Sequence, residues 1–337
     1  MKKSKKKFYA IVCTVLFAAY LFSGCGSKDA KKTDVRIAYF PNITHAQALV
    51  MKNNQTLEKD LGEDYNVSWT SFTAGSSEVE ALFAEEIDIG YIGPVPAING
   101  NVKSNGELTI ISNAADAGAV MIKAADSDID SVADLDGKTV AIPQVGNTQH
   151  LCLLDLLSQN DLQPVDAGGT VEVVAVENAN LQNMFDQGNV DAALVPEPWG
   201  TILTASENIS LMLDYQDIYQ NGNYPVAVVV VRTDFMDEHP EVVEKFLRAH
   251  IDTTNSINAD LDTSTDAIIE EIEAVTGNAY DKDVVLNAFT RTNITTTLNE
   301  DALWAFAQTS YEQEFINELL EKNLVDTSVL EELLQKE

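Results

Sequence analysis

The chain has 337 residues and a formal net charge of −32, from 53 acidic and 21 basic side chains. This excess argues against binding to nucleic acid and against broad adhesion to anionic lipid, because both need cationic patches. The four histidines (His45, His150, His239 and His250) do not cluster at metal-ligand spacing, so neither a metal nor another cofactor is expected.

The first 24 residues predict a secretory signal peptide. Five lysines precede an uncharged, mostly apolar run over residues 8–22, which is followed by Ser23-Gly24-Cys25. A basic segment, a short apolar segment and small residues at a cleavage site are the three features of a signal peptide. Fifteen residues are too few to span roughly 30 Å of hydrocarbon as a helix. The end of the segment resembles the lipobox of bacterial lipoproteins, which implies that Cys25 is lipidated. The alternative is ordinary secretion with an incidental cysteine.

Cleavage would change the charge and the cysteine content of the chain. Removing the five lysines of the signal peptide takes the net charge from −32 to −37, and Cys152 then remains as the one unmodified cysteine. No disulfide is therefore expected within the mature chain, and Cys152, in an apolar helical stretch, is interpreted as a core residue. An extracytoplasmic domain, anchored by lipid to the outer face of the cytoplasmic membrane, is expected on either the cell surface or the periplasmic side.

Strands and helices alternate after a flexible tether over residues 25–34. Extended or strand segments are predicted at residues 35–39, 65–72, 87–92, 108–113, 119–123, 138–142, 171–176, 191–195, 210–214 and 224–232. Helices are predicted at residues 46–61, 77–86, 97–103, 149–159, 178–187 and 199–205, and from residue 237 to the end the pattern is almost wholly helical. This alternation predicts an α/β fold with parallel sheets.

Two such sets of elements indicate two lobes. Extended runs near 114–123 and 222–232 would join them, which places residues 35–115 and 225–337 in one lobe and residues 116–224 in the other. The helical tail is expected to pack on the first lobe. Ligand sites in such sheets lie at the carboxyl ends of the strands, and hinge rotation near 114–120 and 222–226 would close the lobes on a ligand.

Small polar residues recur where these strands end and the next helices begin. The candidate ligand-binding residues at these junctions are Thr44, His45, Gly75, Ser76, Ser77, Gly93, Pro94, Gly146, Asn147, Thr148, Gln149, Glu197 and Trp199. Free N–H groups and a partial positive charge at helix N-termini favour anions. None of these loops contains Lys or Arg, so an anion would be held by dipoles and hydroxyl groups.

Each junction residue also has a structural interpretation. A Ser or Thr at a helix start is commonly a cap, and a junction glycine is commonly part of a turn. His45 is more simply a cap or a loop contact than a base. Trp199 could pack in the core or form an aromatic wall, and Glu197 could bond backbone near the hinge or receive a ligand ammonium. The functional interpretation rests on the joint recurrence of these features.

Four stretches carry a more specific resemblance. They are YFPNITHAQAL, FTAGSSEVEALFAEEIDIGYIGPVPAINGN, IPQVGNTQHLCLLDLL and VPEPWGTIL. In this order and spacing they resemble the aliphatic sulfonate, nitrate and taurine group of ABC-transporter substrate-binding proteins, over about residues 35 to 235. The resemblance implies a type II periplasmic-binding-protein fold and a cleft lined by the junction loops. It also implies delivery of a small anion to a membrane permease and its ATPase. These are expected on separate chains, because this sequence has no Walker A glycine loop and no membrane bundle, and the protein is expected to be a monomer.

The ligand stays open at this level. An alkanesulfonate is the first choice. Taurine is an alternative because Asp116 or Glu197 could meet its ammonium group, and nitrate, bicarbonate or a pyrimidine precursor of thiamine are further ones. An enzyme related to pyrimidine synthesis, with His45 or Cys152 as suspects, is disfavoured because no G-x-S-x-G or H-E-x-x-H motif is present. A ligand sensor of the same fold is not separable from an importer component.

Overall fold

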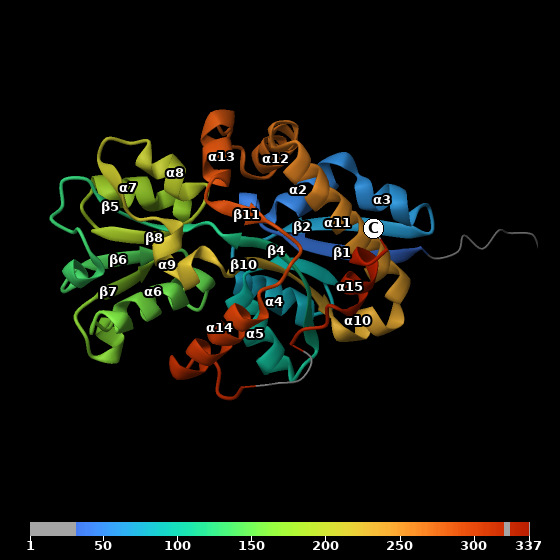
Figure 1. The fold of residues 1–337 in the computed structure, drawn as a ribbon, viewed down its shortest axis with the longest axis horizontal. Helices are drawn as coiled ribbons and strands as arrows, with labels where there is room; N and C mark the ends of the chain where they lie inside the picture. Colours follow the sequence, from blue (N-terminus) through green and yellow to red (C-terminus); the bar gives the residue numbers. More distant parts are fainter. Residues whose placement is uncertain (1–31, 320–323, 337) are drawn as a thin grey trace, which may run out of the picture. The chain divides into compact units, whose positions relative to one another are not determined.

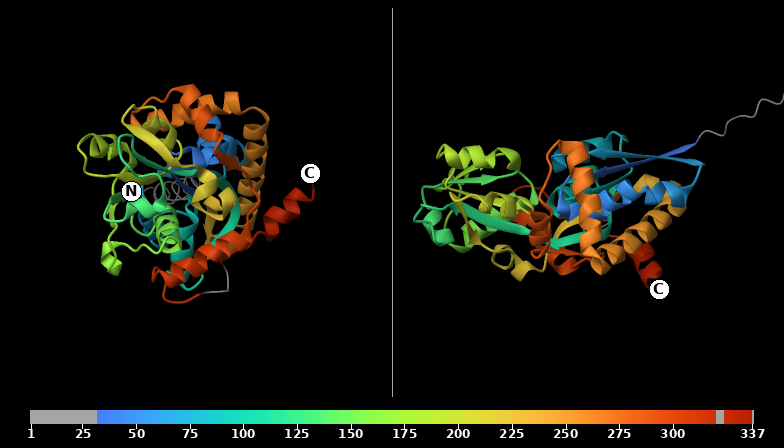
Figure 2. Two further views of the ribbon diagram at one scale, coloured as in Figure 1. Left: turned by 60° about the vertical axis from the view of Figure 1, so that its left-hand side comes forward. Right: turned by 90° about the horizontal axis from the view of Figure 1, so that it is seen from above.

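The computed structural model describes residues 32–319 and 324–336. The predicted signal peptide, Cys25 and residues 26–31 of the predicted tether lie outside the described residues. From Asp34 onward the chain forms one compact unit that contains two β-sheets. Figure 1 shows the green and yellow elements around one sheet at one end of this unit and the blue strands of the other sheet at the opposite end, and Figure 2 shows the same separation from above.

The larger sheet has six strands in the order β11-β4-β10-β3-β1-β2. Its strands are β1 (Thr33–Tyr39), β2 (Tyr65–Ser71), β3 (Ile89–Ile92), β4 (Leu108–Ala117), β10 (Pro225–Arg232) and β11 (Thr292–Ile294). The valine-rich β10 is buried at every position except Arg232, as expected of a strand covered on both faces. It runs antiparallel to both β3 and β4, whereas β1 and β3 are parallel.

The smaller sheet has five strands in the order β7-β6-β8-β5-β9. Its strands are β5 (Ala119–Ala124), β6 (Thr139–Ile142), β7 (Glu172–Ala175), β8 (Ala192–Pro196) and β9 (Ile209–Leu213). Strand β6 is parallel to β7 and β8, but β5 is antiparallel to β8 and β9. The expectation of parallel sheets was therefore wrong for β5 and β10. Both strands lie in the extended runs that join the sheets, and a strand that enters without a crossover helix is free to pair antiparallel.

Helices follow most strands, as the alternation predicted. Those of the first two thirds of the chain are α2 (Ala46–Asn54), α3 (Thr56–Leu61), α4 (Gly75–Phe83), α5 (Pro94–Ser104), α6 (Thr148–Gln159), α7 (Leu181–Asp186), α8 (Trp199–Thr204) and α9 (Tyr215–Ile218). The single helix predicted over 46–61 is two helices, because Gln55 adopts a left-handed conformation with φ 52° between α2 and α3.

The C-terminal third is mostly helical, as predicted. It contains α10 (Thr233–Glu238), α11 (Pro240–Ala259), α12 (Leu261–Thr276), α13 (Lys282–Phe289), α14 (Glu300–Glu312) and α15 (Ser328–Leu334). Helices α11 and α12 pack against α2, beside the six-stranded sheet, but α13 also contacts α8 and α14 contacts α6. The tail thus touches elements of both sheets rather than the first alone, and it contributes the unpredicted strand β11, which is too short to give a sequence pattern.

At one of the two crossings between the sheets, the change of direction depends on the backbone conformation of a glycine. Strand β4 ends at Ala117 and β5 begins at Ala119, with Gly118 between them at φ +75°. A Cβ atom at Gly118 would stand 2.6 Å from the Oγ1 atom of Thr292. Glycine is therefore required at this position both for the backbone conformation and for the close approach of β11.

Candidate functional site

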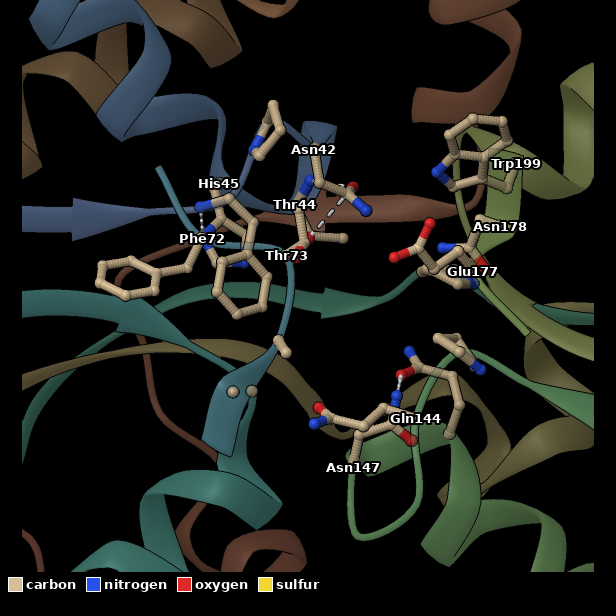
Figure 3. Close-up of a pocket in the computed structure, with 18 of the residues that line it drawn as sticks. Asn42, Thr44, His45, Phe72, Thr73, Gln144, Asn147, Glu177, Asn178 and Trp199 are labelled. Atoms are coloured by element: carbon tan, nitrogen blue, oxygen red, sulfur yellow. Dashed lines mark hydrogen bonds between the residues drawn. The ribbon is translucent and has the colours of Figure 1, made fainter. Parts of the chain in front are cut away.

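A cavity of about 300 Å³ is lined by loops that follow strands of both sheets. The residues after β1, β2 and β3 contribute from the six-stranded sheet, and the residues after β6, β7 and β8 contribute from the five-stranded sheet. Its polar wall consists of Asn42, Thr44, His45, Thr73, Gln144, Asn147, Thr148, Gln149, Glu177, Asn178, Thr276 and Asn278. Figure 3 shows side chains from the two sides facing a common space. The carboxyl ends of the strands therefore meet at one site, as the fold class predicted.

The N-terminus of α6 forms one part of this wall. Asn147 caps the helix, and its side chain accepts a hydrogen bond from the backbone N–H of His150 at 2.8 Å. Helix geometry leaves the N–H groups of Thr148 and Gln149 without intrahelical partners. Thr148 is 3% exposed, and its hydroxyl has no hydrogen-bond partner among the described residues. Three donors thus lie together at a positive helix end on a cavity wall, which is an arrangement suited to an oxyanion.

Helices α4 and α5 begin beside α6. Gly75 is the first residue of α4, and Gly93 precedes α5. A Cβ atom at Gly93 would stand 2.8 Å from the Thr148 Oγ1 atom, and one at Gly75 would stand 2.5 Å from Pro96. Both glycines are therefore needed for close packing of the three helix starts. The prolines at the start of α5 have no N–H group, so α4 and α6 supply most of the backbone donors.

The loop after β1 supplies a third side of the cavity. It forms the short 3-10 helix η1 (Ile43–His45), in which the Asn42 side chain accepts hydrogen bonds from the Thr44 N–H and the Thr44 hydroxyl. Phe40 donates its backbone N–H to His45 Nδ1 at 3.2 Å, and their rings stack with centroids 4.8 Å apart. Burial lowers the pKa of His45 to about 3, so the imidazole is neutral and its Nε2–H is a donor.

The opposite rim of the cavity is aromatic and acidic. Trp199, at the start of α8, meets Tyr280 edge to face with ring centroids 6.3 Å apart, and both line the cavity. Trp199 also packs against the core of the five-stranded sheet, so it has both of the roles considered from the sequence. The exposed Glu177 lies near Trp199 and directs its carboxylate into the cavity (Figure 3). No Lys or Arg side chain lines the cavity among the described residues.

The structure brings most of the predicted site residues to this cavity. Those that line it are Thr44, His45, Gly75, Gly93, Asn147, Thr148, Gln149 and Trp199. The remaining predicted residues, which do not line it, are Ser76, Ser77, Pro94, Gly146 and Glu197. Ser76 instead accepts a hydrogen bond from the Gln144 side chain at 2.8 Å, which joins the loop after β6 to α4.

Glu197 has a full set of protein partners. The side chain is fully buried and accepts hydrogen bonds from the Thr201 N–H at 2.9 Å and the Thr201 hydroxyl at 3.0 Å. Its Oε1 atom lies 3.3 Å from Arg291 Nη1, and Arg291 also pairs with Asp214 at 2.8 Å. Burial raises the pKa of Glu197. These contacts favour the structural alternative that the sequence left open for this residue.

Asp116 likewise lies away from the cavity. It accepts a hydrogen bond from the Asn113 side chain at 2.7 Å and lines a separate hollow with Arg291. Burial raises the pKa of Asp116 to about 6. Neither of the two carboxylates that the sequence offered as ammonium partners is therefore on the cavity wall.

Several wall residues were missed from the sequence. Thr73, Gln144 and Asn42 stand in junction loops that were singled out, next to residues that were chosen. Glu177 and Asn178 come just after β7, separated from it by Val176, so the same rule about strand ends could have identified them. Thr276 is the last residue of α12, and Asn278 and Tyr280 lie in the loop between α12 and α13. The helical pattern of the tail gives no signal for them.

The rest of the described chain offers few alternatives to this site. Cys152 is a free, buried thiol in α6 whose pKa is raised by burial. Within residues 32–319 and 324–336 there is no group of three or more His, Cys, Asp or Glu side chains placed to hold a metal ion. Over the same residues, none of the helices combines the length and the apolar character that a membrane crossing requires.

The chain is similar to known proteins in sequence and in structure. The NMT1-like family matches residues 28–272. The taurine-binding periplasmic protein of Escherichia coli strain K12 is 30% identical over 227 residues, which cover 66% of this chain and 66% of that protein, slightly less than two thirds of its length. The periplasmic aliphatic sulphonate binding protein SsuA of Escherichia coli has a TM-score of 0.70 at 22% identity, over 86% of this chain and 95% of that chain.

A second solved structure supports the same fold. The periplasmic nitrate-binding protein NrtA from Synechocystis PCC 6803 has a TM-score of 0.74 at 12% identity, over 91% of this chain and 89% of that chain. At these identities the likeness establishes the fold alone. The predicted type II periplasmic-binding-protein fold is confirmed, as is the resemblance stated from the sequence.

Proposed function

Because the chain belongs to the NMT1-like family, we propose that it is the extracytoplasmic solute-binding component of an ABC importer. Its ligand is a small organic anion, an aliphatic sulfonate, which binds in the cavity between the two sheets. The match to a periplasmic taurine-binding protein and the fold shared with SsuA support this class of ligand. The match covers only part of that relative, so the ligand and the partners are proposed for this chain on the chemistry of its own cavity.

One observation carries the proposal. The starts of α4 and α6 point free N–H groups, and Thr148 an unpartnered hydroxyl, at a cavity that no described Lys or Arg lines. A sulfonate is ionised throughout the physiological pH range, so it needs no basic partner to fix its charge. Its three oxygens can accept the N–H groups of Thr148 and Gln149 and the Thr148 hydroxyl. The aromatic rings of Trp199 and Tyr280 would then cover its carbon chain.

Closure of two lobes is the proposed mechanism of capture. The lobe that contains the six-stranded sheet would comprise residues 35–115 and 225–337, and the other lobe would comprise residues 116–224. Rotation at Ala117 and Gly118 would bring η1 and the start of α4 toward the loops after β6 and β7. The hydrogen bond between Gln144 and Ser76 is a contact that such a rotation would make or break. Ser76 therefore acts in closure rather than in direct contact with the ligand.

The cellular role follows from this mechanism. The closed protein would dock on a membrane permease, whose ATPase drives release of the ligand, and both would be separate chains. The protein would act outside the cytoplasm as a monomer, held to the membrane by lipid on Cys25. It would perform no catalysis. His45 is a weak base because burial lowers its pKa to about 3, and Cys152 is a poor nucleophile because burial raises the pKa of its thiol.

A ligand screen tests the proposal. Purified protein is heated with alkanesulfonates, taurine, nitrate, bicarbonate and pyrimidine precursors of thiamine, and the midpoint of unfolding is recorded. A sulfonate at a hundred times its Kd should stabilise the fold by about 2.7 kcal/mol. Stabilisation by nitrate or a thiamine precursor, with no response to any sulfonate, would contradict the proposed ligand class.

The anchor has its own test. Replacement of Cys25 by alanine should release the protein from membranes or block its processing, because the thioether to lipid is lost. Fractionation of cells and the mass of the mature chain are the measurements. An unchanged membrane fraction in the Cys25→Ala variant would contradict the anchor and leave the ligand proposal intact.

A further inference from the structure

The two ends of the cavity differ in charge, and the proposed function does not explain this difference. At one end lie the starts of α4 and α6, with backbone donors and the free hydroxyl of Thr148. At the other end lie Trp199 and Glu177 (Figure 3), and Tyr280 lines the cavity in contact with Trp199. Glu177 is the one formally charged side chain among the described residues of the wall, because His45 is neutral. The cavity therefore has a donor-rich end and an anionic end.

The charge of Glu177 is not neutralised by the protein. The residue directly precedes the 3-10 helix η4 (Asn178–Asn180), and its side chain is exposed. Its one described hydrogen bond comes from the Asn180 side chain at 3.5 Å, the outer limit for such a bond. Within the described part of the chain, Glu177 has no ion pair with a lysine, arginine or histidine. The carboxylate is thus available to a group on the ligand.

This carboxylate works against a ligand that carries only one negative charge. A plain alkanesulfonate would place its charge in the same cavity of about 300 Å³ as the charge of Glu177. Like charges repel more strongly as the site closes and water leaves, because the effective dielectric constant falls. The chain as a whole adds to the repulsion with a net charge of −32. A ligand that brought a cation to the anionic end would reverse this penalty.

The surroundings of Glu177 suit a cation of a particular kind. Trp199 lies near the carboxylate in Figure 3 and meets Tyr280 edge to face, and aromatic faces attract ammonium groups. We propose that Glu177 receives a protonated amine, so that the site selects aminoalkanesulfonates, which are zwitterions, over sulfonates that lack the amine. This inference rests on the proposed function, because the sulfonate end must still bind at the starts of α4 and α6.

A pair of matched ligands isolates the effect of the amine. 2-Aminoethanesulfonate and 2-hydroxyethanesulfonate share one carbon skeleton and one sulfonate and differ in the terminal group. Calorimetric titration of the wild-type protein should give about tenfold tighter binding of the amine, the size expected for a charge-assisted hydrogen bond in a closing site. In the Glu177→Gln variant the preference should fall to less than about twofold, mainly through weaker binding of the amine.

A second carboxylate on the same strand provides the control. Glu172 is exposed at the start of β7, at the end of the strand away from the cavity. The Glu172→Gln variant removes the same charge from the chain without changing the wall, so it should keep the wild-type preference. The Glu177→Lys variant should reverse the preference and favour sulfoacetate, which carries an anion where the amine was. Because Glu177 is exposed, all three variants should melt within a few degrees of the wild type.

The outcomes separate the two levels of the account. Equal binding of both sulfonates to the wild type, or a preference that survives in Glu177→Gln, overturns the role of Glu177 and leaves the sulfonate proposal standing. In that case Glu177 is only a solvated residue at the start of η4. Failure of both sulfonates to bind overturns the proposed function, and the inference falls with it. Loss of the preference in Glu177→Gln but not in Glu172→Gln supports the inference.

Discussion

Thr148 and Glu78 are both buried, and within the described part of the chain their side chains have no hydrogen-bond partners, but they lie in different surroundings. The Thr148 hydroxyl stands on the cavity wall, whereas the Glu78 carboxyl lies inside the protein on α4, fully buried, with both oxygens unpartnered. A Cβ atom at Gly90 would stand 2.1 Å from Glu78 Oε1, so that glycine makes room for the carboxyl. A buried polar atom without a partner therefore indicates a ligand site only where it lies on a cavity wall.

A third buried group completes the comparison because its partners are present. His250 is fully buried, with Nδ1 2.8 Å from the Tyr91 hydroxyl and Nε2 2.9 Å from the Asn113 carbonyl oxygen. Burial lowers the pKa of His250 to about 4, so the ring is neutral, accepts from Tyr91 and donates to Asn113. Satisfied groups of this kind stabilise the fold, whereas Glu78 costs free energy.

The largest expected effect is a loss of stability when His250, whose two ring nitrogens both have partners, is replaced. Replacing His250 by leucine leaves the Tyr91 hydroxyl and the Asn113 carbonyl unpaired, and the free energy of unfolding should fall by about 3 kcal/mol. Urea denaturation at neutral pH measures this, with the same replacement at the half-buried His239 as the control. An unchanged midpoint would show that the network does not stabilise the fold.

The pH dependence of this effect has a definite sign. The folded pKa of His250 lies below its ordinary value, so its stabilising contribution is present above about pH 6.5 and is lost as the pH falls through about 4. The His250→Leu variant should lose less stability than the wild type between these pH values. Denaturation curves at pH 7 and pH 5 make the comparison.

The next effect is on ligand binding at the helix starts. In Gly93→Ala the new methyl group would stand 2.8 Å from Thr148 Oγ1, in the space that a sulfonate oxygen needs. Affinity should fall about a hundredfold or more, because several bonds to the anion, each worth about 1.5–3 kcal/mol, are disturbed together. Gly93 has an ordinary φ of −65°, so the backbone accepts alanine, but the crowding against Thr148 should also lower the melting temperature, and affinity is measured where the variant is folded. Wild-type affinity in a calorimetric titration would place the anion elsewhere.

Replacing Glu78, in contrast to His250, should stabilise the protein. Burial raises the pKa of Glu78 well above its usual value, so stability is present below about pH 4.5 and is lost as the pH rises toward the raised folded pKa. Replacement by methionine should raise the free energy of unfolding by about 2 kcal/mol at pH 8 and by less at pH 5. The exposed Glu80 of the same helix is the control site. Destabilisation would contradict the claim that the buried Glu78 costs free energy. A change in ligand affinity of more than about twofold would contradict the claim that Glu78 lies apart from the ligand site.

The smallest expected effect is on ligand affinity and tests the role of the Thr148 hydroxyl. Thr148→Ala should weaken sulfonate binding about tenfold, the cost of one hydrogen bond to a charged group, and should leave stability within about 0.5 kcal/mol of the wild type. Thr148→Ser keeps the hydroxyl and should retain affinity. Equal losses in the alanine and serine variants would point to the methyl group and to packing instead.

Much of the fold follows from the alternation of strands and helices, because buried strands such as β10 have a composition that few other elements share. The site is predictable as far as the rule of strand ends reaches, which covers Thr44, Gly75, Gly93 and Thr148. The α12–α13 loop is not predictable in this way. Tyr280 comes to the cavity only through tertiary packing of the tail, which leaves no local pattern.

Two further differences from the sequence predictions have other causes. The break at Gln55 requires a left-handed residue that is not glycine, which propensity does not signal. Glu177 lies within reach of the strand-end rule, but the candidates were chosen mainly among small polar residues and glycines, and Glu177 is neither. Local sequence signals thus identify where helices begin, and they do not identify which exposed side chains point into the cavity.

The most direct test of the central claim follows the backbone amides themselves. Isotope-labelled protein is titrated with ethanesulfonate while amide resonances are recorded by NMR. If uncharged helix starts bind the anion, the amides of Thr148 and Gln149 should shift most, followed by those at the start of α4, while the amide of Glu78 stays in place. Saturable binding that leaves the Thr148 and Gln149 amides unmoved would contradict the account.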